Sequence, residues 1–439
     1  MNETGMNRRG FLGRAALGAA GLAAARLPYP NAALAATQAS DAPVTITLWG
    51  WWDIRMAIYE EAAKGFMEEN PNVTVQVVTL PSGDDVLPKL YSALPSGTGP
   101  TMLKMGEFLF QLRDEELVVP FPEDLFPESW LQEAYPGFDW ATYGRYVVPT
   151  GASASVFVYN TAMFQEAGLD PAAPPRTWDE LIEAAKKLTQ RDDSGAITRA
   201  GFVPGVDFTP LDYLYQLGGN IVTRDNGQPV ATFDTPQMQQ AYQFLADLEL
   251  THKVWSHDFL PSEEAIGTGR AAMTLCESYQ IGDWRSSYAD MMPNLAFAAP
   301  PTPTGEPEPL YGRKSIVLDV SVLTGRPPEE QAAAFRFLEY LYKKRLDIQF
   351  ELVDLIALAP ERKDLLDDPR VKESPWLSIM PEFTAKEHDP VQAIGELQTI
   401  TEDVLTRILV TQEPVASAVS YGQEQMQQLV AKGSLNYLQ

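Results

Sequence analysis

Residue types able to bind a small ligand gather directly after the first apolar run of the chain. Trp49, Trp51, Trp52 and Asp53 stand within five residues of one another. Indole rings cover flat C–H surfaces, and a carboxylate accepts protons from hydroxyl groups. This combination predicts a site for a ligand with flat ring faces and a rim of hydroxyls, such as a sugar. In the alternative interpretation Trp49 belongs to the core and Asp53 caps a helix, while Trp51 and Trp52 fit either role.

Further candidate side chains follow other segments that we expect to be strands. Asp84 opens a predicted helix, so its carboxylate could face a ligand or cap that helix. Glu107 and Tyr279 each follow a predicted strand. In open α/β sheets, ligands bind beyond the carboxyl ends of the strands, which favours such positions. The structural alternatives are a solvated loop carboxylate at Glu107 and an aromatic ring that covers an edge at Tyr279.

Arg313 separates two classes of ligand. Its guanidinium could clamp a phosphate bidentately, or it could pair with a surface carboxylate in so acidic a chain. Glycerol 3-phosphate or a glycerophosphodiester would need donors such as Arg313, Ser153 and Ser155. A neutral sugar would instead need aromatic platforms and acidic acceptors. The aromatic and acidic character of the chain favours a carbohydrate, and the phosphate ligands remain the alternative.

The balance of charge excludes several classes of protein. The 439 residues contain 59 Asp and Glu against 33 Lys and Arg, for a net charge of -26. Such a chain is repelled by phosphate backbones, so we expect no nucleic-acid partner. One cysteine and three histidines are too few for structural zinc or iron–sulfur clusters. No G-x-G-x-x-G loop follows a predicted strand, and we expect neither a metal nor a cofactor.

The residue types of the chain do not single out a catalytic site. A glycoside hydrolase needs two carboxylates about 5 to 10 Å apart, and spacing alone singles out no such pair among 59 acidic residues. Ser-His-Asp chemistry has only His252, His257 and His388 to draw on, and no G-x-S-x-G elbow is present. The sequence therefore predicts a binding protein and no enzyme, with an exported glycan-active enzyme as the less favoured alternative.

The amino terminus resembles a twin-arginine export signal. Arg8 and Arg9 precede the apolar stretch 15–25, which is too short and too weakly apolar to favour the alternative of a membrane anchor. Small residues around Ala35 predict a signal over residues 1–35. The sole cysteine lies at position 276, so no lipoprotein anchor can start the mature chain. We therefore expect an untethered protein in a periplasm.

Alternating strand and helix patterns follow the signal. Apolar residues alternate over 44–48, recur at helical spacing over 58–66, and form a second strand at 73–78, which predicts a β-α-β unit. Farther along, the pattern predicts a strand at 315–323, and Thr177 and Glu180 form a capping box that opens a helix. Parallel strands with helical crossovers predict an α/β fold of open, mostly parallel sheets covered by helices.

Several segments carry a family resemblance. They are residues 145–149, 158–160, 163–171 and 174–181, the Ser-Gly-Thr-Gly-Pro turn at 96–100, and Gly-Arg-Ala-Ala-Met at 269–273. These segments resemble the extracellular solute-binding proteins of the maltose-binding and glycerol-phosphate-binding type. The resemblance spans about residues 43–435. Thr101 departs from the Asp that commonly follows the turn in that family.

The resemblance implies a two-lobed periplasmic binding protein fold with the ligand cleft between the lobes, and delivery of the solute to the permease of an ABC importer. By analogy, the chain would cross between lobes near Thr150, Pro309 and Leu358, and we expect a monomer. In relatives a Gly-Gly pair often stands where this chain has Tyr311 and Gly312, and an aromatic residue often stands at the position of Tyr279. The implied lobes comprise 43–150 with 310–357, and 151–309 with 358–439.

Overall fold

A computed structural model describes residues 42–106, 108–205, 209–306, 312–381, 387–388 and 395–433. The predicted signal at 1–35 and the candidate residues Glu107 and Tyr311 lie outside this set. Within the described ranges, no helix combines the length and the apolar character that crossing a membrane requires.

The first sheet is built on a β-α-β unit. β1 (Val44–Trp51) pairs in parallel with β2 (Val73–Leu80), and α1 (Asp53–Glu69) joins the two strands. Ile46 and Leu48 of β1 are fully buried, and α1 turns Ala62 and Phe66 inward. The helix ends before Asn70 and Pro71, because proline disfavours a helical conformation in the residue that precedes it. The predicted unit is confirmed.

Three more strands complete this sheet. β3 (Met102–Lys104) lies parallel to β1, whereas β13 (Val320–Leu323) is antiparallel to both β3 and β4 (Val118–Val119). The order is therefore β2-β1-β3-β13-β4. We call the body around this sheet the first lobe.

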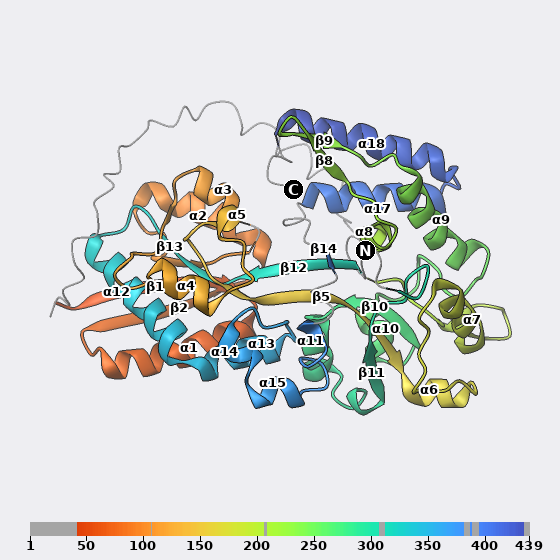
Figure 1. Ribbon diagram of the computed structural model, residues 1–439, viewed down its shortest axis with the longest axis horizontal. Coiled ribbons are helices and arrows are strands. Elements are labelled where there is room, and N and C mark those ends of the chain that lie inside the picture. Colours follow the sequence, from red (N-terminus) through yellow and green to blue (C-terminus); the bar gives the residue numbers. More distant parts are fainter. Residues whose placement is uncertain are drawn as a thin grey trace, which may run out of the picture. The chain divides into compact units, whose positions relative to one another are not determined.

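The second sheet is organised around one long strand. Every residue of β5 (Pro149–Asn160) is buried. It pairs antiparallel with β10 (Met273–Glu277), β11 (Leu295–Ala298) and β12 (Gly312–Leu318), and β14 (Glu387–His388) lies parallel to β12. We call the body around this sheet the second lobe. Figure 1 shows β5 and β12 running side by side through the middle of the described chain.

The strands that link the sheets correct two details of the sequence prediction. The predicted strand 315–323 is broken at Asp319, because β12 belongs to the second sheet and β13 to the first. The change of sheet therefore lies after the expected crossing near Pro309. The expectation of mostly parallel sheets is wrong for the second sheet, since β5 leaves the first lobe and β12 returns to it, so the two strands must run in opposite directions.

A third segment, around Leu358 and Ala359, lies against β5. Ala152 of β5 and Ala359 exchange backbone hydrogen bonds of 2.8 Å in both directions. A Cβ atom added at Gly151 would lie 2.6 Å from the carbonyl oxygen of Ala359 and 2.8 Å from Cβ of Leu358. Only glycine allows so close an approach. The assignment of residues to lobes on either side of Thr150 and Leu358 stays a prediction.

Helices cover both sheets, and two small hairpins complete the fold. α12 (Pro328–Glu339) packs on β1 and β13, and α8 (Thr209–Gln216) packs on β12. α17 (Gly395–Leu409) and α18 (Val415–Lys432) pack on α9 (Pro236–Leu250) (Figure 1). The hairpins are β6 (Gln190–Arg191) with β7 (Ile197–Arg199), and β8 (Val222–Asp225) with β9 (Gln228–Ala231). The other helices are α2 (Val86–Ala93), α3 (Leu109–Asp114), α4 (Glu128–Ala134), α5 (Trp140–Tyr143), α6 (Thr161–Glu166), α7 (Trp178–Leu188), α10 (Ser262–Gly267), α11 (Gln280–Ser287), α13 (Leu346–Leu355), α14 (Lys363–Leu366) and α15 (Pro369–Glu373).

Candidate ligand-binding site

Trp51 ends β1 at the carboxyl edge of the first sheet, where its ring is partly exposed. Nζ of Lys104 lies 3.7 Å from the centroid of this ring, and the Phe108 ring meets it edge-on at 5.6 Å. Glycines surround the rest of the indole: a Cβ atom at Gly83 would lie 3.4 Å from Nε1 of Trp51, and one at Gly106 would lie 3.3 Å from Cη2. The loops that follow β1, β2 and β3 therefore converge on one aromatic ring.

Trp52 takes a different direction from Trp51. Its ring meets that of Tyr279 at right angles, with 6.4 Å between the centroids, so the contact joins the first lobe to the second. Both rings pack against a buried apolar cluster that includes Ile356 and Leu358. Trp52 has a φ of 78°, which is rare for a bulky residue, and strained backbone of this kind clusters at functional sites. The structure thus brings together two predicted residues that are far apart in the sequence.

The remaining residues of the Trp49 to Asp53 segment resolve the alternatives left by the sequence. Trp49 is 9% exposed and belongs to the core, as the structural alternative predicted. Asp53 is exposed and begins α1, but the N-cap residue is Trp52 and no side chain caps the helix, so the capping interpretation of Asp53 is wrong. The carboxylate of Asp53 is open to solvent beside Trp52.

The predicted residues Asp84 and Glu107 also belong to these loops. Asp84 lies in the 3-10 turn Gly83–Asp85, directly beside the glycine that borders Trp51. Its side chain, like all of Glu107, lies outside the described part of the structure. Asp85 precedes α2 without capping it, and its carboxylate accepts a hydrogen bond from Ser82 instead. Ligand contacts by Asp84 and Glu107 stay predictions.

The candidate residues of the second lobe lie on the two linking strands. Ser153 is 1% exposed, and its hydroxyl lies 3.4 Å from that of Ser278. Ser155 is equally buried, and its hydroxyl donates a 2.7 Å hydrogen bond to Asp212. Both hydroxyls are thus engaged by protein partners.

The predicted segment from Tyr311 to Arg313 meets the second sheet at its start. Gly312 and Arg313 begin β12, paired in register with Glu387 and His388 of β14. The side chain of Arg313, like all of Tyr311, is not among the described parts of the chain.

A buried polar cluster, which is not among the predicted functional residues, lies where the chain passes between the sheets. Nη2 of Arg55 donates a 2.7 Å hydrogen bond to the hydroxyl of Thr150, and Tyr59 donates one to Oδ1 of Asp319. Each of these four side chains is at most 2% exposed. Burial raises the pKa of the Asp319 carboxyl, and Arg55 and the Tyr59 hydroxyl oppose that rise. The only signal in the sequence is the placement of Arg55 and Tyr59, four residues apart on the inward face of α1.

A second group of carboxylates surrounds α11. Burial, and then the charge of Glu263, raise the pKa of Asp283 to about 6. Glu263 itself accepts a 2.8 Å hydrogen bond from the amide of Gln280. A proton on Asp283 is therefore bound more tightly in the folded chain than in the unfolded chain.

This shift predicts how Asp283→Asn changes stability with pH. Because the folded-state pKa is the higher one, the ionised carboxylate destabilises wild type once pH rises from about 4 through about 6. The variant should therefore unfold at higher urea than wild type at about pH 8, and the two should converge at about pH 4. In a Glu263→Gln background, the advantage at high pH should shrink. An advantage that is the same at both pH values would contradict the assignment.

The remaining titratable groups and grooves of the described residues lie away from the candidate site. Across the described ranges, no three His, Cys, Asp or Glu side chains are grouped to hold a metal ion. Nδ1 of His257 lies 2.8 Å from a carboxylate oxygen of Glu249 at the surface. Two open grooves on the second lobe, one beside Pro174 and Arg176 and one beside Trp178 and Gln243, include none of the predicted ligand residues.

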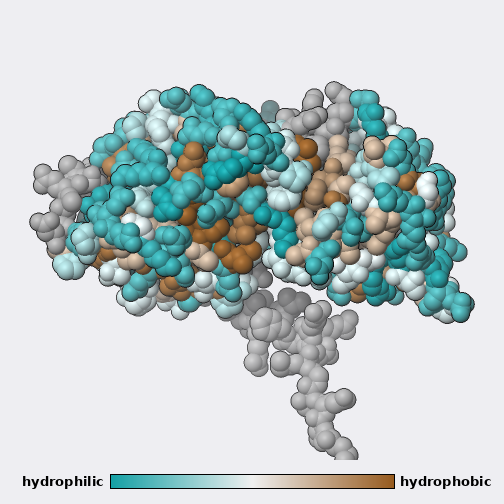
Figure 2. Space-filling model, turned by 90° about the horizontal axis from the view of Figure 1, so that it is seen from below, coloured by the Kyte–Doolittle hydropathy of each residue, from teal (hydrophilic) through white to brown (hydrophobic). Residues whose placement is uncertain are grey.

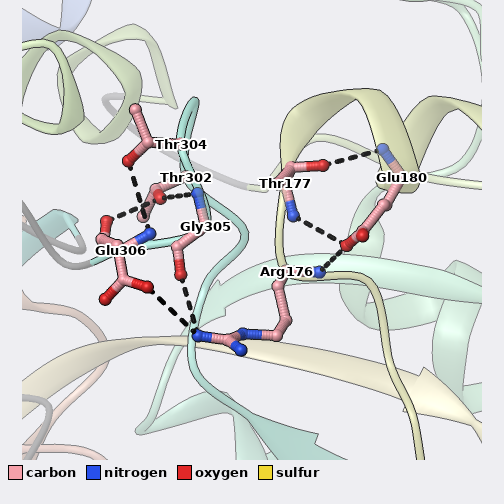
Figure 3. A network of polar contacts seen from close by, with 7 residues as sticks. All are labelled: Arg176, Thr177, Glu180, Thr302, Thr304, Gly305 and Glu306. Atoms are coloured by element: carbon pink, nitrogen blue, oxygen red, sulfur yellow. Dashed lines mark hydrogen bonds and ion pairs between the residues drawn. The ribbon is translucent and has the colours of Figure 1, made fainter.

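The last segment of the run that carries the family resemblance, 174–181, has a structural role. Thr177 and Glu180 form the predicted capping box, which starts α7 (Figure 3). Arg176 donates a 3.2 Å hydrogen bond to the carbonyl of Gly305, and the backbones of Thr302 and Arg176 are also joined at 3.0 Å. This motif therefore fastens residues 302–305 beside the start of α7 in the second lobe.

Comparison with known families identifies the fold. A family model described as bacterial extracellular solute-binding protein matches residues 50–345, a span that includes strands of both sheets. The chain belongs to this family. The predicted two-lobed periplasmic binding protein architecture is therefore confirmed, and both linking strands lie within the matched span.

Individual members of the family are similar to this solute-binding protein over most of its length. The arabinooligosaccharide-binding protein of Halalkalibacterium halodurans is 25% identical over 347 residues, which cover 75% of this chain and 74% of the relative. The sn-glycerol-3-phosphate-binding periplasmic protein UgpB of Escherichia coli is also 25% identical over 347 residues, with 72% and 75% covered. Maltose-bound T. maritima MalE3 superposes with a TM-score of 0.71 at 20% identity, covering 88% of this chain and all of that one, which establishes a shared fold.

Proposed function

We propose that this solute-binding protein captures a carbohydrate between its two lobes and delivers it to the permease of an ABC importer. The observation that carries the proposal is the Trp51 ring, which is partly exposed at the carboxyl edge where the loops after β1, β2 and β3 converge. An indole in this setting offers a platform for the flat C–H face of a sugar ring. The name of the H. halodurans relative supports a saccharide ligand.

The architecture suits capture by closure. A ligand that contacts both lobes favours the conformation in which the lobes are close together, so binding shifts the population toward it. On the face drawn in Figure 2, apolar residues gather on the first lobe beside the junction with the second lobe, and further apolar residues lie on the second lobe across from them. We propose Trp51, Asp53, Asp84 and Glu107 as contacts from the first lobe. From the second lobe we propose Tyr279, and from the start of β12 Arg313, with Trp52, Tyr311 and Gly312 bordering the cleft between the lobes. Ser153, which is buried and hydrogen-bonded to protein, is left out of this set.

Glycerol 3-phosphate remains the second candidate ligand, because UgpB is a relative of similar identity. A phosphate requires several hydrogen-bond donors at once. The hydroxyls of Ser153 and Ser155 face protein partners, which weakens the case for a phosphate site built on them. The carbohydrate proposal therefore ranks first.

The export route and the state of the mature protein belong to the same proposal. Residues 1–35 would direct twin-arginine export to the periplasm and then be removed, leaving an untethered monomer without catalytic activity. The pair Arg8 and Arg9 and the position of the sole cysteine, Cys276, support this view. The intact mass of the protein recovered from a periplasmic extract should match a start near Ala36 without added lipid.

Calorimetric titration of the mature protein tests the ligand class. The panel comprises arabinobiose to arabinotetraose, maltotriose, mannotriose and sn-glycerol 3-phosphate. At least one neutral saccharide should bind with one-to-one stoichiometry, and chromatography of the mixture should detect no cleavage product. Binding of sn-glycerol 3-phosphate alone, lost in Arg313→Ala, would overturn the carbohydrate proposal. Turnover of a glycan would overturn the assignment as a binding protein.

A further inference from the structure

Lys104 occupies an unusual place for a lysine. It ends β3, a strand hydrogen-bonded to β1 on one side and to β13 on the other, and it is only 4% exposed. Its neighbours Met102, Leu103 and Met105 are fully buried apolar residues. Lysine is almost never buried to this extent unless other groups compensate its charge.

The ammonium group of Lys104 lies against one face of the Trp51 ring. Nζ lies 3.7 Å from the centroid of the Trp51 ring and 3.5 Å from the carbonyl oxygen of Met105. A cation this close to an indole face is attracted by the ring quadrupole, and the attraction grows when the pair is shielded from water. The burial of Lys104 therefore strengthens its hold on the ring.

The other neighbours of Trp51 restrict the ring to the same orientation. The backbones of Gly83 and Gly106 lie so close to the indole edge that a Cβ atom at either glycine would touch the ring, and Gly106 adopts a φ of 152°. Phe108, which is 7% exposed, closes a further side with an edge-on contact. An indole with a cation over its face and neighbours along its edges has few orientations left, so it is pre-organised before any ligand arrives.

We infer that Lys104 is a positioning residue for Trp51, which fixes the orientation of the indole and so sets ligand affinity without touching the ligand. The part of the inference that concerns ligand affinity rests on the proposed function. The orientation of the Trp51 ring by Lys104 is a property of the ligand-free protein and can be tested without a ligand. Pre-organisation raises affinity because the ring then loses little rotational freedom on binding.

The variant Lys104→Met tests the inference, because methionine keeps an unbranched apolar stem and removes the charge. Ligand-free protein labelled with 5-fluorotryptophan is examined by fluorine NMR, and the Trp51 signal is assigned by its loss in Trp51→Phe. We expect one narrow Trp51 signal in wild type, and a shifted and broadened or split signal in Lys104→Met. Lys104→Arg, which retains the cation, should stay closer to wild type.

A matched control is available elsewhere in the first lobe. Nζ of Lys89, an exposed residue, lies 4.9 Å from the centroid of the Trp49 ring, which is part of the core. Lys89→Met removes a cation from an indole in the same way, but the ring is already held by packing. Its spectrum and its ligand affinity should match wild type.

Affinity provides the second readout. With the saccharide found by titration, Lys104→Met should bind about 5- to 10-fold more weakly than wild type, at an unchanged urea midpoint. An unchanged Trp51 signal in Lys104→Met would overturn the inference, and so would a changed signal with unchanged affinity. If no saccharide binds wild type, the proposed function fails, and the NMR comparison still decides whether Lys104 orients Trp51.

Discussion

Trp51→Ala is expected to weaken saccharide binding about 30-fold or more, while the protein remains folded. Buried or stacked tryptophans are typical hot spots of binding, where truncation costs about 2 kcal/mol or more, and each 1.4 kcal/mol corresponds to a factor of ten. The ring is partly exposed at the edge of the first sheet, so its loss leaves the core strands in place. Titration calorimetry on wild type and variant measures the change.

Two further variants sharpen this comparison. Trp51→Phe keeps a smaller ring and should lose less affinity than Trp51→Ala. Tyr91→Ala removes another aromatic ring of the first lobe, 37% exposed on α2, and should leave affinity unchanged. Equal affinities for wild type and Trp51→Ala would remove Trp51 from the site and with it the main support for a carbohydrate ligand.

Asp319→Ala is expected to destabilise the folded protein by about 3 to 5 kcal/mol at neutral pH. Asp319 is fully buried between β12 and β13, accepts a hydrogen bond from Tyr59 and balances the charge of Arg55. Its removal leaves the buried guanidinium without that compensation, and such uncompensated charges are among the costliest defects in a protein. Urea unfolding followed by circular dichroism measures the loss.

An exposed ion pair provides the control for Asp319. Asp347 pairs with Arg345 at 2.7 Å, but its side chain is 53% exposed, so Asp347→Ala should cost less than about 1 kcal/mol. The double variant Arg55→Met with Asp319→Ala should lose less stability than the sum of the two single variants, because neither charge is then left alone. Additive losses would contradict the coupling between these side chains.

Much of the local structure could be predicted from the sequence. The alternation over 44–48 and the helical spacing over 58–66 define β1 and α1, because burial of one face imposes a period on apolar residues. The capping box at Thr177 is an equally local signal. The family resemblance is confirmed by the family model that matches residues 50–345.

The site is harder to read because its parts come from distant segments. Trp51 and Asp53 could be singled out by type and position, and so could Tyr279, which lies against Trp52. Lys104 cannot be singled out in the sequence, because a lone lysine in an apolar run gives no sign that it will lie over an indole ring. Ser153 and Ser155 appeared as free donors in the sequence, whereas the register of β5 buries both against Ser278 and Asp212.

By itself, the sequence determined the class of fold, the family, the aromatic character of the candidate site and the acidic net charge. Tertiary structure alone decided that the strand pattern 315–323 divides at Asp319, that Asp319 meets Tyr59 across 260 positions, and that Lys104 lies over Trp51. The physical reason is that periodicity records which face of an element is buried, whereas strand order and register decide which buried side chains meet.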